Sequence, residues 1–192
     1  MTRPRHESEK LSVLVAAERD AQLDLLLREL RRSVSHVVHL FPVTQRIPAE
    51  HDIILADFSP AMLDLLPWAP GEATAALILL LPQNGAYSLG KLRDCCPDAV
   101  LHRPFQTAAI QTSLVLARSQ YQFIQRLRSR ITRLDENIKA VRDIERAKMI
   151  IMNGRRVDED EAYAYLRNQA MERRMTVASL ASHLVDSHQL LR

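Results

Sequence analysis

The chain has 192 residues, of which 47% are hydrophobic, and this excludes a disordered chain and leaves room for one ordinary domain and a small one. No apolar run approaches the ~20 residues that cross a bilayer, and residues 1–10 are too polar for a signal peptide. The adjacent Cys95 and Cys96 do not have the spacing of metal ligands. We therefore expect a cytoplasmic protein without membrane contact, metal or cofactor. The net charge of +3 is unevenly distributed along the chain: residues 1–120 hold 12 basic and 13 acidic side chains, whereas residues 121–192 hold 14 basic and 10 acidic ones. The basic excess indicates either a polyanionic partner for the C-terminal third or only a solvated surface.

Short apolar runs alternate with helical patterns in the first part of the chain. Asp20 can cap a helix whose leucines recur at helical spacing, and further helices are expected around residues 60–66 and 86–95. The apolar runs predict strands over residues 11–15, 34–40, 52–57, 75–81 and 99–101, of which the first is expected to be buried. This order predicts a doubly wound, five-stranded parallel sheet over residues 1–106, with any site at the carboxyl ends of its strands.

Asp57 at the end of the third strand, and Arg103-Pro104-Phe105 after the fifth, resemble the receiver domain of bacterial response regulators. The resemblance implies that Asp57 stands in the phosphoacceptor position and that a cis proline follows the fifth strand. Three other features of the family are changed. Ala16-Ala17 stand where the family has a metal-binding acidic pair, with Glu18 only after them. Leu80 or Leu81 replaces a hydroxyl residue, and Arg103 replaces a lysine.

These changes bear on the chemistry that Asp57 can perform. Phosphoryl transfer needs a metal ion to neutralise developing charge, and Mg²⁺ needs several oxygen ligands. One aspartate without an acidic pair does not supply them. We therefore predict an inactive pseudo-receiver, in which Asp57 only ends a strand, with phosphorylation at Asp57 kept as the alternative.

A long helix is expected after the sheet, because no glycine or proline stands between Phe105 and Asn153. Within residues 107–143 its apolar side chains recur at heptad spacing, with isoleucine at each a position and Leu, Leu and Val at d. They are Ile124, Leu127, Ile131, Leu134, Ile138 and Val141, which we call the seam. This pattern favours a parallel two-stranded coiled coil, with Arg130 opposite Asp135 of the partner chain. The alternative is that the seam packs against another helix of the same chain.

Residues 136–192 are predicted to form a small three-helix, all-α domain. Asn153-Gly154 are expected to end the first helix, with Gly154 at positive φ. Asp158, with Glu161 three residues later, can cap the second helix, and Thr176 can cap the third. One of the two tyrosines of the second helix, Tyr163 or Tyr165, is expected to pack in the core, together with Met149, Met152 and Met171.

This module resembles the ANTAR domain, the RNA-binding unit of the amidase-regulator and nitrate-regulator antiterminators. The resemblance covers about 55 residues and lies in Arg146-Ala147-Lys148, Met152, Glu161-Ala162-Tyr163, Leu166-Arg167, Ala170-Met171 and Ala181. The order of pseudo-receiver, coiled coil and ANTAR domain resembles the amidase-regulator branch. It implies a dimeric antiterminator that binds leader RNA hairpins and is silenced by a ligand-sensing partner protein.

RNA loops expose phosphates and unstacked bases that basic and aromatic side chains contact. The candidate RNA contacts are Lys148, Tyr163, Arg167, Arg173 and Arg174, with Arg167 and Arg174 expected on one face of the same helix, and Arg155 and Arg156 as second choices. The alternative is that each basic residue is only a solvated charge.

Three other classes of function are a DNA-binding regulator, a coiled-coil adaptor and an enzyme. The second helix of the module lacks the Asn, Gln and Arg cluster of a DNA recognition helix. A coiled-coil adaptor without nucleic acid remains open. No paired carboxylates, activated nucleophile or glycine-rich phosphate loop indicates an enzyme, so no catalytic residue is predicted.

Overall fold

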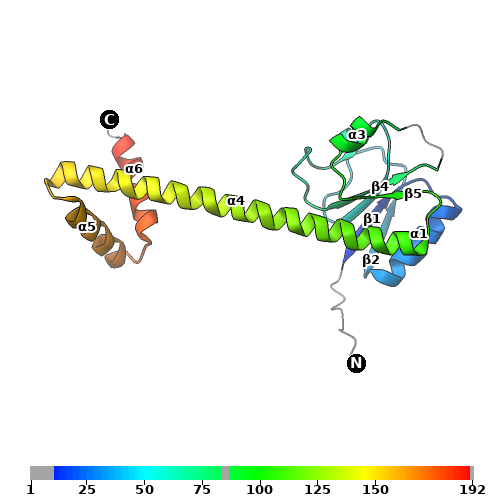
Figure 1. Cartoon of the computed structure of the whole chain (residues 1–192), viewed down its shortest axis with the longest axis horizontal. Coiled ribbons are helices and arrows are strands. Elements are labelled where there is room, and N and C mark those ends of the chain that lie inside the picture. Colours follow the sequence, from blue (N-terminus) through cyan, green and yellow to red (C-terminus); the bar gives the residue numbers. More distant parts are fainter. Residues whose placement is uncertain (1–10, 84–86, 191–192) are drawn as a thin grey trace, which may run out of the picture. The chain divides into compact units, whose positions relative to one another are not determined.

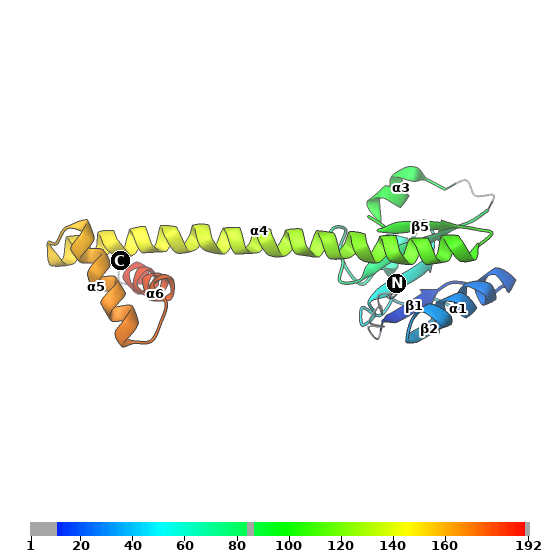
Figure 2. The same cartoon turned by 60° about the horizontal axis from the view of Figure 1, so that its bottom comes forward.

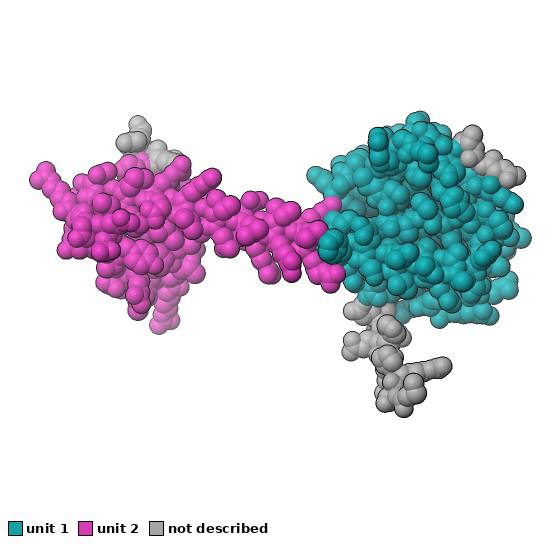
Figure 3. All heavy atoms as spheres, in the orientation of Figure 1, with its two compact units in different colours: residues 1–125 teal, residues 126–192 magenta. Residues whose placement is uncertain are grey.

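The protein is described from a computed structural model, and the described residues are 11–83 and 87–190. The expected absence of a signal peptide concerns residues 1–10, which lie outside that part. The chain divides into two compact units, residues 1–125 and 126–192 (Figure 3). Each unit has its own hydrophobic core. The division falls inside helix α4 (Thr107–Arg155), whose first turns belong to the first unit. Within the described residues, no helix is both long and apolar enough to span a membrane.

The first unit is built on a five-stranded sheet in which all neighbouring strands are parallel, with the order β2-β1-β3-β4-β5 (Figure 1). The strands are β1 (Ser12–Ala16), β2 (His36–Leu40), β3 (Ile53–Asp57), β4 (Ala76–Leu81) and β5 (Ala99–His102). All six residues of β4 are buried, which explains its uninterrupted apolar sequence. The predicted doubly wound, receiver-like fold is therefore confirmed, with strand ends within two residues of those expected.

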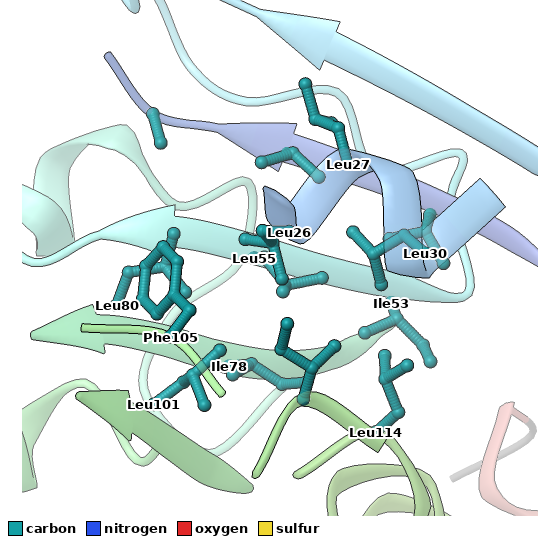
Figure 4. Packing of buried hydrophobic residues seen from close by; sticks show 14 of the residues in the cluster. Leu26, Leu27, Leu30, Ile53, Leu55, Ile78, Leu80, Leu101, Phe105 and Leu114 are labelled. Carbon is teal, nitrogen blue, oxygen red and sulfur yellow. The ribbon is translucent and has the colours of Figure 1, made fainter. Parts of the chain in front are cut away.

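Helices cover both faces of this sheet (Figure 2). Helix α1 (Ala21–Ser33) and the first turns of α4 pack on the face that includes Val13 and Val15, whereas α2 (Met62–Leu65) and α3 (Leu89–Asp94) lie on the face of Leu14. Side chains alternate between the two faces because successive strand residues point in opposite directions. Figure 4 shows the first core, where leucines of α1 and Leu114 of α4 meet the strand side chains.

The second unit packs the end of α4 against α5 (Glu159–Glu172) and α6 (Val177–Leu190), so the predicted three-helix arrangement is confirmed. The predicted caps are present: the carboxylate of Asp158 accepts a hydrogen bond from the Glu161 N–H (2.8 Å), and the hydroxyl of Thr176 accepts one from the Ser179 N–H (3.1 Å). Half of the buried core residues are alanines, which let the helix backbones approach closely. The core is Ala147, Ile151, Ala162, Leu166, Ala170, Leu180, Ala181 and Val185.

Two expectations, one about a helix end and one about the core of this unit, were wrong. Helix α4 runs past Gly154 to Arg155, and the residue with positive φ is Arg156 (φ 58°), whose N–H bonds to the carbonyl of Met152 (2.9 Å). Met149 and Met171 are also not core residues, being 55% and 66% exposed. The helices meet at small alanine side chains, so the core is filled without the side chains of Met149 and Met171.

Candidate functional site

A charged cluster lies at the carboxyl ends of β1, β3 and β5, the edge of the sheet where a site was expected. Its centre is Arg103, whose two terminal nitrogens bind two different carboxylates, Asp20 at 2.6 Å and Asp57 at 3.1 Å. The second oxygen of Asp57 accepts a hydrogen bond from the Glu18 N–H (3.1 Å). Arg103 therefore bridges the two aspartates, and its side chain is only 16% exposed.

The surroundings hold this bridge in place. The other oxygen of Asp20 caps α1 by accepting from the Leu23 N–H (2.6 Å), so Asp20 fixes both the helix and the arginine. The Arg103 guanidinium also lies over the Phe105 ring, 4.8 Å from its centre. The Arg103–Pro104 peptide bond is cis, as the receiver resemblance implied. Sequence reasoning had given Asp20 only the capping role.

This arrangement does not fit the metal ion that receiver chemistry requires. Ala16 and Ala17 are buried and offer no side-chain oxygen. Leu80 pairs with Asp57 in the sheet, at a position where receiver domains have a hydroxyl residue. The carboxylates of Asp20 and Asp57 are already paired with a guanidinium, which supplies the positive charge itself. Among the described residues, no group of three potential ligand side chains is placed to hold a metal.

We expect no stable adduct at Asp57 when the protein is incubated with acetyl phosphate and Mg²⁺. Arg103 and the Glu18 N–H occupy both carboxylate oxygens, and no acidic pair is present to bind the metal. Intact-mass measurement after incubation checks this, with an active response regulator as positive control. A stoichiometric phosphoryl adduct would show that the site is a working receiver.

Lys148 is placed differently from the exposed contact that was expected. Its side chain is only 10% exposed, and its ammonium binds Glu145 one turn earlier (2.8 Å) and Glu159 at the start of α5 (2.5 Å). These hydrogen bonds raise the pKa of Lys148 above its usual value. The lysine therefore ties α4 to α5, and sequence periodicity could not show this because Glu159 comes from another helix.

The other candidate RNA contacts are all exposed, but they do not form one helical face. Arg167 lies on α5, whereas α5 ends at Glu172 and Arg174 follows it in a turn with φ 53°. The N–H groups of Arg174 and Met175 bond to carbonyls of the last helical turn, which makes Arg174 the left-handed residue that usually is glycine. The expectation that Arg167 and Arg174 share one helix was thus wrong.

The two tyrosines of α5 are now distinguished. Tyr163 is 45% exposed and so remains available as a contact, whereas Tyr165 packs against the core of the unit. The Arg155 guanidinium lies 3.8 Å from the centre of the Tyr165 ring and donates a hydrogen bond to its hydroxyl (2.9 Å). Sequence reasoning named Arg155 only as a second choice, since nothing in the spacing links it to Tyr165.

The seam is left open on α4. Ile124 is partly buried, and the other five side chains are between 40% and 60% exposed, although a lone helix in water rarely shows such a stripe. The predicted seam is therefore a row of isoleucine, leucine and valine side chains that is largely exposed along α4.

Comparison with known proteins gives two family matches: "AmiR, N-terminal" over residues 11–118 and "ANTAR domain" over residues 132–185. The aliphatic amidase regulator of Pseudomonas aeruginosa is 24% identical over 184 residues, covering 92% of this chain and 91% of that protein. The transcriptional regulatory protein PdtaR of Mycobacterium tuberculosis is 26% identical over 139 residues, covering 71% and 68%. Among solved structures, the response regulator StyR shares 15% identity with a TM-score of 0.45, covering 92% of this chain and 99% of that one.

Proposed function

Because the chain belongs to the family of regulators with an AmiR N-terminal domain, followed here by an ANTAR domain, we propose that it is a transcription antiterminator that binds RNA hairpins. One observation carries the proposal: the ANTAR match over residues 132–185 falls inside a unit with its own core and several exposed arginines. The names of its relatives describe regulators rather than enzymes, and we propose no catalytic activity. Because its proposed ligand is RNA, we propose that the protein acts in the cytoplasm.

We propose that the protein acts as a homodimer joined along the seam in a parallel coiled coil. Burying each seam side chain contributes roughly 1.5–3 kcal/mol, before the cost of ordering the chains. Between two copies, Arg130 of one chain would lie opposite Asp135 of the other. The domain limits that fit this scheme are residues 1–106 for the pseudo-receiver, 107–143 for the connecting helix and 136–192 for the RNA-binding domain.

We propose that a ligand-sensing protein partner, rather than phosphorylation, controls the activity. The Arg103 bridge argues against phosphorylation, because the guanidinium already pairs with the Asp57 carboxylate that would have to accept the phosphoryl group. Control by phosphorylation with the same RNA-binding output remains the alternative, and the acetyl phosphate experiment separates the two.

The proposed RNA contacts are the exposed Tyr163, Arg167, Arg173 and Arg174. Lys148 is proposed as a positioning residue for this surface, because its ammonium binds Glu145 of α4 and Glu159 of α5 and so joins the two helices. Phosphates bind arginine by paired, charge-assisted hydrogen bonds, which suits the three arginines.

We expect the double variant Arg167→Gln, Arg174→Gly to bind hairpin RNA more weakly and with a smaller salt dependence. Each lost phosphate contact should lower the slope of log affinity against log salt by about 0.7. Glycine adopts the φ of 53° at residue 174 without strain, so this change does not weaken the fold. Fluorescence anisotropy with a hairpin from the leader of the chain's own operon measures both quantities.

Duplex DNA of matched length is the control ligand, and circular dichroism confirms that the variant is folded. Unchanged affinity and slope in a folded variant would remove Arg167 and Arg174 from the RNA surface. Equal binding of duplex DNA and hairpin RNA by the unaltered protein would contradict the proposed function itself.

A further inference from the structure

The second unit contains a groove between the end of α4, α5 and α6, with a volume of about 420 Å³. Its walls come from Ile150, Ile151, Leu166, Leu180 and Leu184. This size lies within the range of pockets that hold small organic groups.

The polar side chains that line this groove are cationic or neutral. Arg155 comes from the last turn of α4, Arg173 from the end of α5 and His183 from α6, and none of the lining residues is acidic. Gln169 also lines the groove and donates a hydrogen bond to Glu172, which itself is not a lining residue (2.7 Å). A groove of this charge is complementary to a polyanion.

One wall of the groove is a cation–π pair. The central carbon of the Arg155 guanidinium lies over the Tyr165 ring, 3.8 Å from its centre, and a hydrogen bond to the tyrosine hydroxyl fixes where the guanidinium lies. Arginine that rests on an aromatic ring offers its other face for stacking, and unstacked RNA bases stack on such planes. Since the pair is already assembled, little order would have to be imposed on binding.

We propose that this groove binds an unstacked base of a single-stranded RNA loop, with the base on the Arg155 guanidinium and the neighbouring phosphate at Arg173. The inference rests on the proposed function and deepens it by naming where a loop base sits. Arg173 lines the groove and also belongs to the proposed exposed RNA surface, so a single RNA loop can contact both.

The test measures hairpin affinity for the full-length protein and the variants Arg155→Gln, Arg155→Lys and Arg173→Gln. Arg142→Gln is the matched control, because it removes the same charge from α4 eight residues before Ile150, about 12 Å along the helix. We expect about tenfold weaker binding for Arg155→Gln and Arg173→Gln, and a change under about twofold for Arg142→Gln.

Arg155→Lys separates stacking from charge, because lysine keeps the cation but has no plane. Hairpins carrying 2-aminopurine at single loop positions should lose fluorescence at one position when the unaltered protein binds. That signal should be absent with Arg155→Lys. Thermal melting by circular dichroism shows whether each variant is folded.

Three results would overturn the inference while the unaltered protein still binds the hairpin in preference to duplex DNA. These are unchanged affinity in folded Arg155→Gln and Arg173→Gln, an equal loss in Arg142→Gln, or an unchanged 2-aminopurine signal in Arg155→Lys. If the unaltered protein shows no preference for hairpin RNA, the proposed function fails and the groove inference fails with it.

Discussion

Replacing Ile131 and Leu134 by glutamate is expected to turn a dimeric protein into a monomer. Four aliphatic side chains per dimer would leave the seam, at roughly 1.5–3 kcal/mol each, so dimer affinity should fall on the order of 10⁴-fold or more. Glutamate is a good helix former, and α4 itself should persist. Light scattering after size-exclusion chromatography at micromolar concentration gives the mass directly.

The control for this experiment is the neighbouring residue. Thr132→Glu introduces the same side chain one position along, at a b position that faces away from the seam. We expect Thr132→Glu to remain dimeric and the single variant Ile131→Glu to be weakened. A monomeric unaltered protein at micromolar concentration would contradict the proposed coiled coil.

Leu166→Ala is expected to unfold the second unit and to abolish RNA binding while the sheet domain stays folded. Leu166 is 1% exposed at the centre of a core in which half the residues are alanine. Emptying such a site costs about 2–5 kcal/mol, which is a large part of the stability of so small a unit. RNA binding should be lost because the groove and the exposed arginines depend on that packing.

Two signals separate the units in a urea titration. Trp68 is the only tryptophan and packs in the second core of the sheet unit, so its fluorescence follows the first unit, whereas far-ultraviolet circular dichroism follows the helices. Met171→Ala is the matched control on the same helix, since Met171 is 66% exposed and its loss should cost under about 0.5 kcal/mol. Leu166→Ala with unchanged helix stability would contradict the packing described here.

The differences between expectation and structure lie where side chains from separate segments meet. Asp20 was expected only to cap α1, yet its second oxygen binds Arg103, which is 83 residues away in the chain. Lys148 was expected to be free, yet Glu159 of the next helix holds it. Each of these contacts depends on how elements pack, and no spacing along one element encodes it.

Local patterns were enough to determine the elements of this protein. Apolar runs predicted five strands in the observed order along the chain, and aspartate and threonine predicted three helix starts, because a cap bonds only to the next few N–H groups. The heptad seam and the absence of acids at Ala16 and Ala17 could likewise be read from the sequence.

Only the tertiary structure decided which charged side chains are exposed and which are paired with another residue. It joins Arg103 to two aspartates, buries Lys148 between two helices, exposes Tyr163 while packing Tyr165, and places Arg155 on that packed ring. A charge is free or paired according to its nearest neighbours in space, and long side chains reach partners that the sequence places far away. The sequence can therefore supply the candidate residues of the proposed RNA-binding surface, but which of them are exposed depends on the fold.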